Sequence, residues 1–214
     1  MESGGALAAG LELRRDRSGE ARLSGRFPYR SPAVLSDGGR GGRPRKEMFE
    51  AAAFRYRIEK PGEDIHLLVG HDFDHPLASK ETGTLTFRDT PAALLISATI
   101  KPQIAETTHG RDALALIASG LAVGLSPGFR LPPERAVPRE EAESFEDEPD
   151  DGRPSPLDGQ PQRGAQIRII RQALLYEFSL VTRPAYAAAA VELTRSQAEA
   201  RPSGLVTVHR RWRA

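Results

Sequence analysis

The sequence predicts a mainly β domain of the α+β class. Short apolar or alternating runs recur along the chain, and only one stretch has clear helical spacing. Turn-forming residues separate these runs, with 20 Gly and 17 Pro among 214 residues. This length suits one domain, and a hydrophobic content of 39% indicates a compact core with substantial loops and tails.

The first expected element is a β-hairpin made by residues 11–15 and 21–29. Both segments alternate polar and apolar residues imperfectly, and Asp16, Ser18 and Gly19 supply turn chemistry between them.

The segment after this hairpin is expected to begin irregularly. Residues 31–46 are rich in Gly, Arg, Pro and Ser and predict a loop, and residues 47–53 could form a helical turn. Strands are expected at several apolar or β-branched runs beyond it. These runs are residues 54–59, 65–70, 84–89, 93–100, 166–170 and 173–181.

The clearest helical pattern spans residues 108–119. Thr108 is a suitable N-cap residue, Leu114 and Ile117 share a face, and Gly120 fits the C-terminal stop. The sequence therefore predicts a helix here, just before the next apolar run.

Three parts of the chain are expected to differ in order. They are a flexible N-terminus at 1–10, a folded domain at 11–193, and a polar, basic C-terminal tail at 194–214. The domain contains an acidic, Pro- and Gly-rich insertion at 130–165, with eight acids and one Arg between residues 139 and 151. Such a segment cannot bury enough apolar surface to offset its ordering entropy, so we expect it to be disordered.

The composition excludes several classes of site. The chain has no cysteine, which rules out disulfides, thiolate zinc sites and a Cys nucleophile. The net charge of +1 gives no overall field for binding nucleic acid. The acidic start resembles no signal peptide, and no stretch approaches the roughly 18 apolar residues of a membrane span. The default expectation is a soluble cytoplasmic protein.

Two separated segments place reactive side chains at the ends of predicted strands. The run Leu67-Leu-Val-Gly-His-Asp72 carries His71, and an expected strand at 121–125 leads to Ser126 before a Pro-Gly turn. A serine hydroxyl needs a base to accept its proton, and imidazole is the usual base near neutral pH. Ser126 and His71 are therefore the candidate nucleophile and base.

The surroundings of Ser126 leave simpler interpretations open. Gly124 to Gly128 spells Gly-x-Ser-x-Gly, the nucleophile elbow of α/β-hydrolases, but that elbow needs a helix after the serine. The proline-rich segment 127–133 disfavours such a helix. Ser, Pro and Gly are also default turn residues, so only pairing with His71 would distinguish Ser126 from an ordinary turn serine.

A third group would orient the imidazole. Glu177 is an acid inside an otherwise apolar strand, where a carboxylate is costly unless it is paired or solvated. An exposed, solvated Glu177 is the simpler alternative. Asp72 competes by adjacency to His71, although neighbouring side chains on a strand point to opposite faces.

A metal site is a further alternative. Residues 71–75 contain two His and two Asp, a composition suited to metal ligation. On a helix, His71 and His75 would share one face. Gly70 and Pro76 bracket the segment and disfavour a helix there.

Four motifs occur in order between about residues 11 and 191. They are Arg22-Leu-Ser-Gly-Arg-Phe-Pro-Tyr29, Leu67-Leu-Val-Gly-His-Asp72, the helix 113–120 with Leu121-Ala-Val-Gly-Leu-Ser-Pro-Gly-Phe129, and Tyr176-Glu-Phe-Ser-Leu-Val-Thr-Arg-Pro-Ala-Tyr186. Together they resemble the prohead proteases, the capsid-maturation serine proteases of tailed phages and related prophage or gene transfer agent elements. Pro127 departs from the pattern, since the family often has an aromatic or other side chain there.

This resemblance implies a fold similar to the herpesvirus assemblins, a closed or partly closed β-barrel with a few surrounding helices. It implies Ser126 as nucleophile, His71 as base and Glu177 as third member, with no cofactor and no metal. The insertion at 130–165 could cover the cleft or be a self-cleavage site.

The implied activity is limited proteolysis within immature capsids in the bacterial cytoplasm. The substrate and partner would be a scaffold segment or the N-terminal region of the major capsid protein, and the protease itself could be processed. No nucleic acid or membrane is required, and a homo-oligomer is compatible with the sequence. Two rival functions are a catalytically inactive head-assembly or scaffold protein with the same fold, and a metal hydrolase using His71 and His75.

Overall fold

The computed structural model of this chain describes residues 5–6, 12–15, 19–39, 42–122, 124–150, 152, 163–184 and 186. The tail predicted at 194–214 lies outside the described residues, as does most of the N-terminus at 1–10. The strands are β1 (Gly5–Ala6), β2 (Glu12–Arg15), β3 (Ala21–Pro28), β4 (Ala33–Ser36), β5 (Arg45–Phe49), β6 (His66–Val69), β7 (Asp72–Ser79), β8 (Leu85–Asp89), β9 (Ala93–Ile100), β10 (Gly124–Arg130), β11 (Glu143–Asp147), β12 (Gln166–Ile170) and β13 (Leu174–Val181). The helices are α1 (Arg55–Glu59), α2 (Pro102–Ala105), α3 (Thr108–Ala118) and α4 (Arg139–Ala142).

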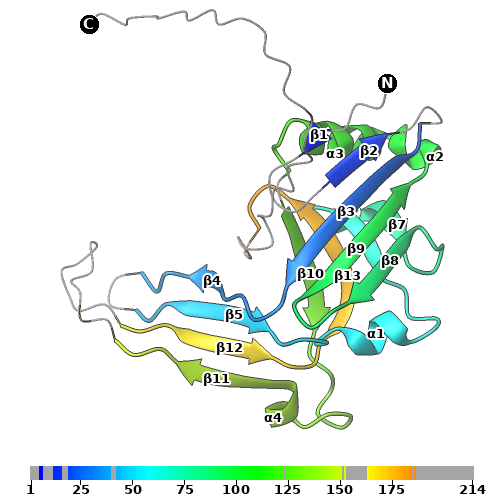
Figure 1. Cartoon of the computed structure of the whole chain (residues 1–214). Helices are drawn as coiled ribbons and strands as arrows, with labels where there is room; N and C mark the ends of the chain where they lie inside the picture. The colour runs from blue at the N-terminus through cyan, green and yellow to red at the C-terminus, as the bar shows by residue number, and fades with distance from the viewer. Residues whose placement is uncertain are drawn as a thin grey trace, which may run out of the picture.

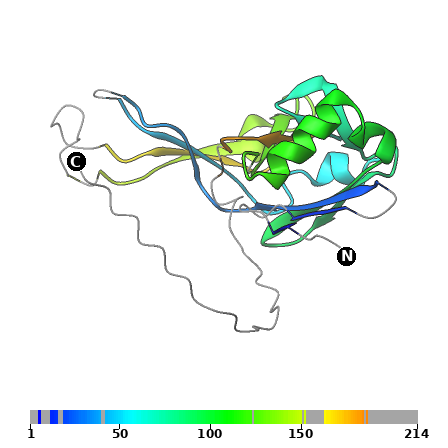
Figure 2. The same cartoon turned by 90° about the horizontal axis from the view of Figure 1, so that it is seen from above.

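The described strands form three sheets. The body sheet has the order β1-β2-β3-β9-β8, the site sheet has the order β10-β13-β6-β7, and the arm sheet has the order β11-β12-β5-β4. Figure 1 shows the arm sheet projecting away from the body and site sheets, and the view from above shows its thin, extended outline (Figure 2). The mainly β, α+β class is confirmed. Among the described strands no sheet closes on itself, so the barrel is not confirmed.

Most strands predicted from local pattern are present. The N-terminal hairpin forms as β2 and β3, and β6, β8, β9, β12 and β13 lie where apolar runs predicted them. The predicted helix is α3, capped by Thr107 rather than Thr108, because the Thr107 side chain accepts a hydrogen bond from the Gly110 N–H. None of the described helices has the length and apolar character needed to cross a membrane.

The predictions for residues 31–59 were wrong. The expected loop at 31–46 contains β4 and the start of β5, and the expected helical turn at 47–53 contains the rest of β5. The expected strand at 54–59 contains α1 instead. β5 pairs in parallel with β12, more than a hundred residues away in sequence. Such distant pairing leaves little trace in local composition.

The insertion expected to be disordered at 130–165 is partly regular. Residues 139–147 form α4 and β11, and β11 pairs antiparallel with β12 at the edge of the arm sheet. The buried Glu143 pairs there with Arg139 and Arg168. This ladder and the ion pairs replace the apolar core that the segment lacks. Residues 151 and 153–162 lie outside the described residues.

Aromatic side chains fill the junction where the three sheets meet. Phe27 of β3 is fully buried, and its ring lies 5.5 Å from that of Phe49 and 5.6 Å from that of Phe178, measured between centroids. These residues come from the body, arm and site sheets respectively. Phe54 and Tyr186 complete the cluster. The junction therefore fixes the site sheet against both of the others.

Candidate active site

His71 lies at the tip of the hairpin that joins β6 and β7. Val69 and Asp72 are cross-strand partners, so the loop has two residues, Gly70 and His71, with φ values of 64° and 63°. Positive φ at both central positions is the signature of a type I′ turn. Histidine is among the few non-glycine residues enriched in this left-handed region. The turn, rather than the end of a strand, sets the direction of the imidazole.

The imidazole of His71 pairs with the carboxylate of Glu177. Nδ1 of His71 lies 2.7 Å from Oε1 of Glu177, across 106 residues of sequence. The Glu177 side chain is only 4% exposed, whereas that of His71 is 46% exposed. A buried carboxylate therefore holds Nδ1 of the ring. The ring is half-exposed, so Nε2 is left to accept or donate a proton. The alternative of a solvent-exposed Glu177 is wrong.

The other carboxylate oxygen of Glu177 contacts a residue that the sequence analysis did not single out. Ser179 Oγ donates to Glu177 Oε2 at 2.8 Å, and the His71 N–H donates to Ser179 Oγ at 2.8 Å. One signal in the sequence could have identified Ser179. It follows Glu177 by two positions on a strand, and such residues point to the same face.

Ser126 lies in the middle of β10 rather than in a turn after it. Ser126 is the cross-strand partner of Ser179, and Gly128 is the partner of Glu177. Partners in an antiparallel pair point to the same face, as do residues two apart on one strand. Ser126 therefore shares a face of the site sheet with Glu177 and Ser179. Leu125 and Phe178 point to the opposite face, into the core.

A glycine makes room for the Glu177 side chain. A Cβ on Gly128 would lie 1.9 Å from Oε1 of Glu177 and 2.6 Å from its Cδ. The carboxylate therefore occupies the space above Gly128 that any larger residue would fill. The space beside Gly124, on the same strand, is occupied by Pro184 instead, because a Cβ on Gly124 would lie 2.5 Å from Pro184 Cγ.

The proline after Ser126 is explained by the position of β10 at the sheet edge. The Gly70 N–H donates to the Leu180 carbonyl, so Leu180 faces β6 and the alternating Ser179 faces β10. The backbone N–H and C=O of Ser126 consequently point toward β13, and those of Pro127 point away from it. Proline at position 127 therefore removes no hydrogen bond between β10 and β13. Because proline has no N–H, residue 127 cannot donate to an oxyanion.

The predicted absence of a helix after Ser126 is confirmed, since β10 continues to Arg130. The site is thus built on a strand and a hairpin, unlike a nucleophile elbow. Among the described residues no hydrogen bond joins Ser126 to His71.

The other candidate residues near His71 have different partners. Asp72, the competing third member, pairs with His75 at 3.0 Å and accepts a hydrogen bond from the Asp74 N–H at 2.9 Å. The His75 ring lies 5.3 Å from that of His109, whose Nε2 is 3.1 Å from the Pro76 carbonyl. His71 and His75 therefore face different carboxylates. The described residues contain no group of three or more His, Asp and Glu suited to a metal ion.

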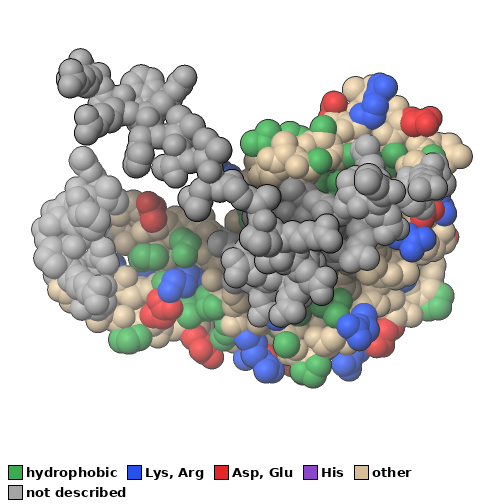
Figure 3. Space-filling model, turned by 45° about the horizontal axis from the view of Figure 1, so that its top comes forward, with side chains coloured by type: hydrophobic (Ala, Val, Ile, Leu, Met, Phe, Trp, Pro, Cys, Tyr) green, Lys and Arg blue, Asp and Glu red, His purple; other side chains and the backbone are tan. Residues whose placement is uncertain are grey.

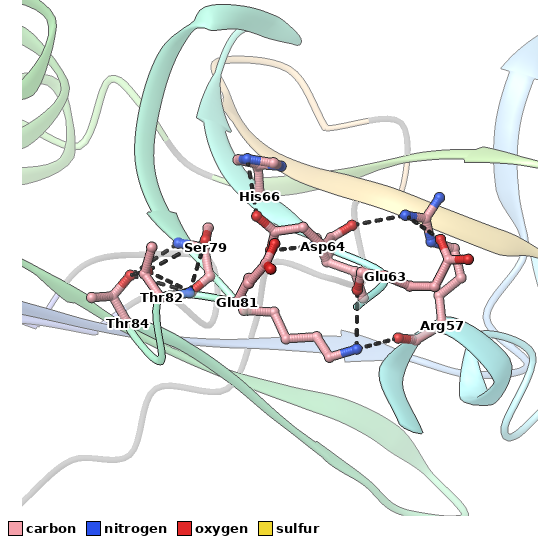
Figure 4. Close-up of polar contacts among 10 residues, drawn as sticks. Arg57, Glu63, Asp64, His66, Ser79, Glu81, Thr82 and Thr84 are labelled. Carbon is pink, nitrogen blue, oxygen red and sulfur yellow. Dashed lines mark hydrogen bonds and ion pairs between the residues drawn. The ribbon is translucent and has the colours of Figure 1, made fainter. Parts of the chain in front are cut away.

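A separate polar cluster supports the opposite end of the β6–β7 hairpin (Figure 4). Asp64 accepts hydrogen bonds from the N–H groups of Ile65 and Glu81, and its Oδ2 lies 3.3 Å from Nε2 of His66. Burial alone would raise the pKa of Asp64. The hydrogen bonds from Glu81, Ser79 and Ile65, together with His66, hold it below its ordinary value. This cluster has a structural explanation, and it adjoins the His71–Glu177 pair, because His66 is the parallel cross-strand partner of Glu177.

Comparison with known proteins identifies the family of the chain. A family described as caudovirus prohead serine protease matches residues 40–203, which is more than half of the chain. The chain belongs to this family. No curated protein and no solved structure gives a match. The resemblance inferred from the sequence motifs is thus confirmed at the level of the prohead protease family, whereas the likeness to herpesvirus assemblins stays a prediction.

The matched segment contains every residue of the candidate site. His71 and Ser126 lie within residues 40–203, as do Glu177, Ser179 and Gly128. Prohead proteases are serine peptidases that act in capsid maturation. The described surface shown in Figure 3 carries intermixed acidic and basic side chains.

Proposed function

We propose that this chain is a serine endopeptidase of capsid maturation, in which Ser126 is the nucleophile, His71 the base and Glu177 the group that orients the base. The observation that carries the proposal is the 2.7 Å contact between His71 Nδ1 and Glu177, on the face of the site sheet that also carries Ser126. The family match supports the same reaction class.

In the proposed mechanism, Glu177 accepts the Nδ1 proton of His71 in a hydrogen bond and leaves Nε2 as the proton acceptor. Ser126 Oγ attacks the scissile carbonyl carbon while Nε2 takes the hydroxyl proton. The tetrahedral intermediate collapses, the C–N bond breaks, and the imidazolium returns its proton to the leaving amine. Water then hydrolyses the acyl-serine with His71 again acting as base.

The oxyanion needs donors that the strand around Ser126 does not supply in full. Pro127 has no N–H, and the Ser126 N–H points toward β13. In this proposal the hydrogen-bond donors to the oxyanion come from a segment other than β10 or from groups that surround the bound peptide. The reaction needs neither a metal nor a cofactor.

We further propose that the substrate is a scaffold segment or the N-terminal region of the major capsid protein, cleaved inside the immature capsid. The protease chain itself is a second substrate in this proposal. For the fold, we propose an architecture similar to the assemblin barrel. Co-expression with the capsid protein, followed by mass measurement, tests the substrate. Capsid protein shortened by wild type and left intact by Ser126→Ala is the expected result.

Labelling with a phosphonate probe tests the activity itself. We expect the wild-type chain to be labelled at Ser126 and Ser126→Ala to remain unlabelled, because only the activated hydroxyl reacts. Ser97→Ala is a matched control, since Ser97 is a strand serine of the body sheet. Equal labelling of wild type and Ser126→Ala would exclude Ser126 as nucleophile. An unlabelled wild type would favour the catalytically inactive head-assembly protein.

A further inference from the structure

We propose that Ser179 is a positioning residue that holds both members of the His71–Glu177 pair, an inference that rests on the proposed peptidase function. Its hydroxyl donates to Glu177 Oε2 and accepts from the His71 N–H, each at 2.8 Å. One side chain thus fixes the carboxylate and the backbone of the base at the same time.

The carboxylate depends on this hydroxyl because its other donor has to act in the reaction. Glu177 is buried, and in the described part of the chain its hydrogen bonds come from the imidazole and from Ser179 alone. The imidazole gains and loses a proton at Nε2 during each cycle. Ser179 supplies the donor that does not change, and it holds the plane of the carboxylate while the ring is charged and discharged.

The backbone of His71 depends on the same hydroxyl. A non-glycine residue at φ 63° is held there only when its surroundings determine the conformation. The His71 N–H belongs to a central residue of the turn, whose ends pair through Val69 and Asp72. Ser179 Oγ accepts this N–H and anchors the tip of the hairpin to β13. The direction of the imidazole is set through that anchor.

Ser179 is placed for this role and unsuited to be the nucleophile. It is fully buried and is the cross-strand partner of Ser126, so it lies between the strand of the nucleophile and the turn of the base. Its single proton is already donated to Glu177, and its Oγ points away from solvent. Ser126 is the partly exposed serine of this pair.

The test compares Ser179→Ala with Ser179→Thr, which retains the hydroxyl. For Ser179→Ala we expect the rate of phosphonate labelling at Ser126 and the kcat for a capsid-derived peptide to fall about tenfold to a hundredfold, with little change in KM, since a hydrogen bond to a charged group is lost. Ser179→Thr should restore most of the rate. Ser79→Ala removes another buried, hydrogen-bonded serine of the site sheet and is the control. It should keep the wild-type rate.

A double-mutant cycle separates positioning from a general loss of stability. If Ser179 acts through Glu177, then Ser179→Ala should slow the Glu177→Gln enzyme far less than it slows wild type. Additive losses would contradict the proposal, as would a wild-type labelling rate in Ser179→Ala. In both cases labelling of Ser126 in wild type would still support the peptidase.

Two further outcomes are decisive. If Ser179→Ala does not fold, Ser179→Cys keeps the size while weakening both hydrogen bonds, and a wild-type rate for it would overturn the role of the hydroxyl. If wild type is not labelled at Ser126 at all, the proposed function fails and the inference about Ser179 fails with it.

Discussion

At the scale of single residues, the site depends on the space above Gly128. A Cβ there would overlap Glu177 Oε1 at 1.9 Å, and the carboxylate is the flexible end of a side chain that can rotate aside. Glycine at this position is thus required by the close approach of the acid, and not by backbone conformation.

Gly128→Ala should therefore separate activity from folding. We expect the labelling rate at Ser126 to fall at least about tenfold, because the displaced carboxylate no longer meets Nδ1 of His71, with only a modest loss of melting temperature. Gly124→Ala is the matched comparison. A Cβ there would meet Pro184 instead, so it should lower stability while folded protein keeps its labelling rate. An unchanged rate in Gly128→Ala would contradict the assigned position of Glu177.

The sequence named Glu177 as a candidate partner of His71, because an acid in an apolar strand is costly unless it is paired or solvated. That reasoning left an exposed Glu177 open, and only the motif resemblance favoured its pairing with His71. The left-handed turn at Gly70-His71 was not accessible, because Gly-His is an uncommon choice for a type I′ turn. The mid-strand position of Ser126 was also missed, because the Pro-Gly that follows it is usually a turn signal. A proline at an outward-facing edge position reverses that interpretation.

At the scale of elements, the arm sheet is where local patterns failed. Its strands are joined by buried polar contacts between distant residues. Arg168 of β12 pairs with Glu143 of β11 and with Glu47 of β5, and the Tyr186 hydroxyl also donates to Glu47. Burial and the adjacent carboxylate raise the pKa of Tyr186 far above its ordinary value. Charged residues in short runs predict loops when read alone, since a sequence does not show which charges pair.

This polar network predicts acid sensitivity of the arm. Burial alone would raise the pKa of Glu143, but hydrogen bonds and charge from Arg168 and Arg139 hold it below its ordinary value of 4.5. A depressed pKa stabilises the folded state above pH 4.5, and this contribution is lost as the pH falls through the folded-state pKa. Wild type should therefore lose stability between about pH 5 and pH 3.

Glu143→Gln tests this dependence. Its free energy of unfolding in urea should be lower than that of wild type at pH 7 by about 1–3 kcal/mol, and the difference should shrink toward about pH 3. Glu146→Gln, at an exposed position of the same strand, is the control. Its free energy of unfolding should follow the same pH dependence as that of wild type. A difference that grows on acidification would have the wrong sign for a carboxylate stabilised by arginine.

At the scale of the whole molecule, the three sheets share one aromatic junction. Phe27 touches the rings of Phe49, Phe54, Phe178 and Tyr186, with centroid distances between 5.0 and 5.8 Å. The body, arm and site sheets therefore all pack against one shared cluster of buried aromatic rings. Apolar runs identified most of these strands, but not which of them would meet, because that depends on packing across the whole chain.

Removal of the central ring should destabilise all three sheets together. Phe27→Ala is expected to lower the free energy of unfolding by about 3–5 kcal/mol, from lost burial and the cavity left behind. Phe145→Ala, which truncates a phenylalanine that is 57% exposed on the arm, should change it by less than about 0.5 kcal/mol. Hydrogen exchange followed by fragment mass measurement should show the arm and site strands losing protection together in Phe27→Ala. If the arm alone lost protection while the His71–Glu177 strands kept theirs, the sheets would be independent units and the junction would not be what holds the site in place.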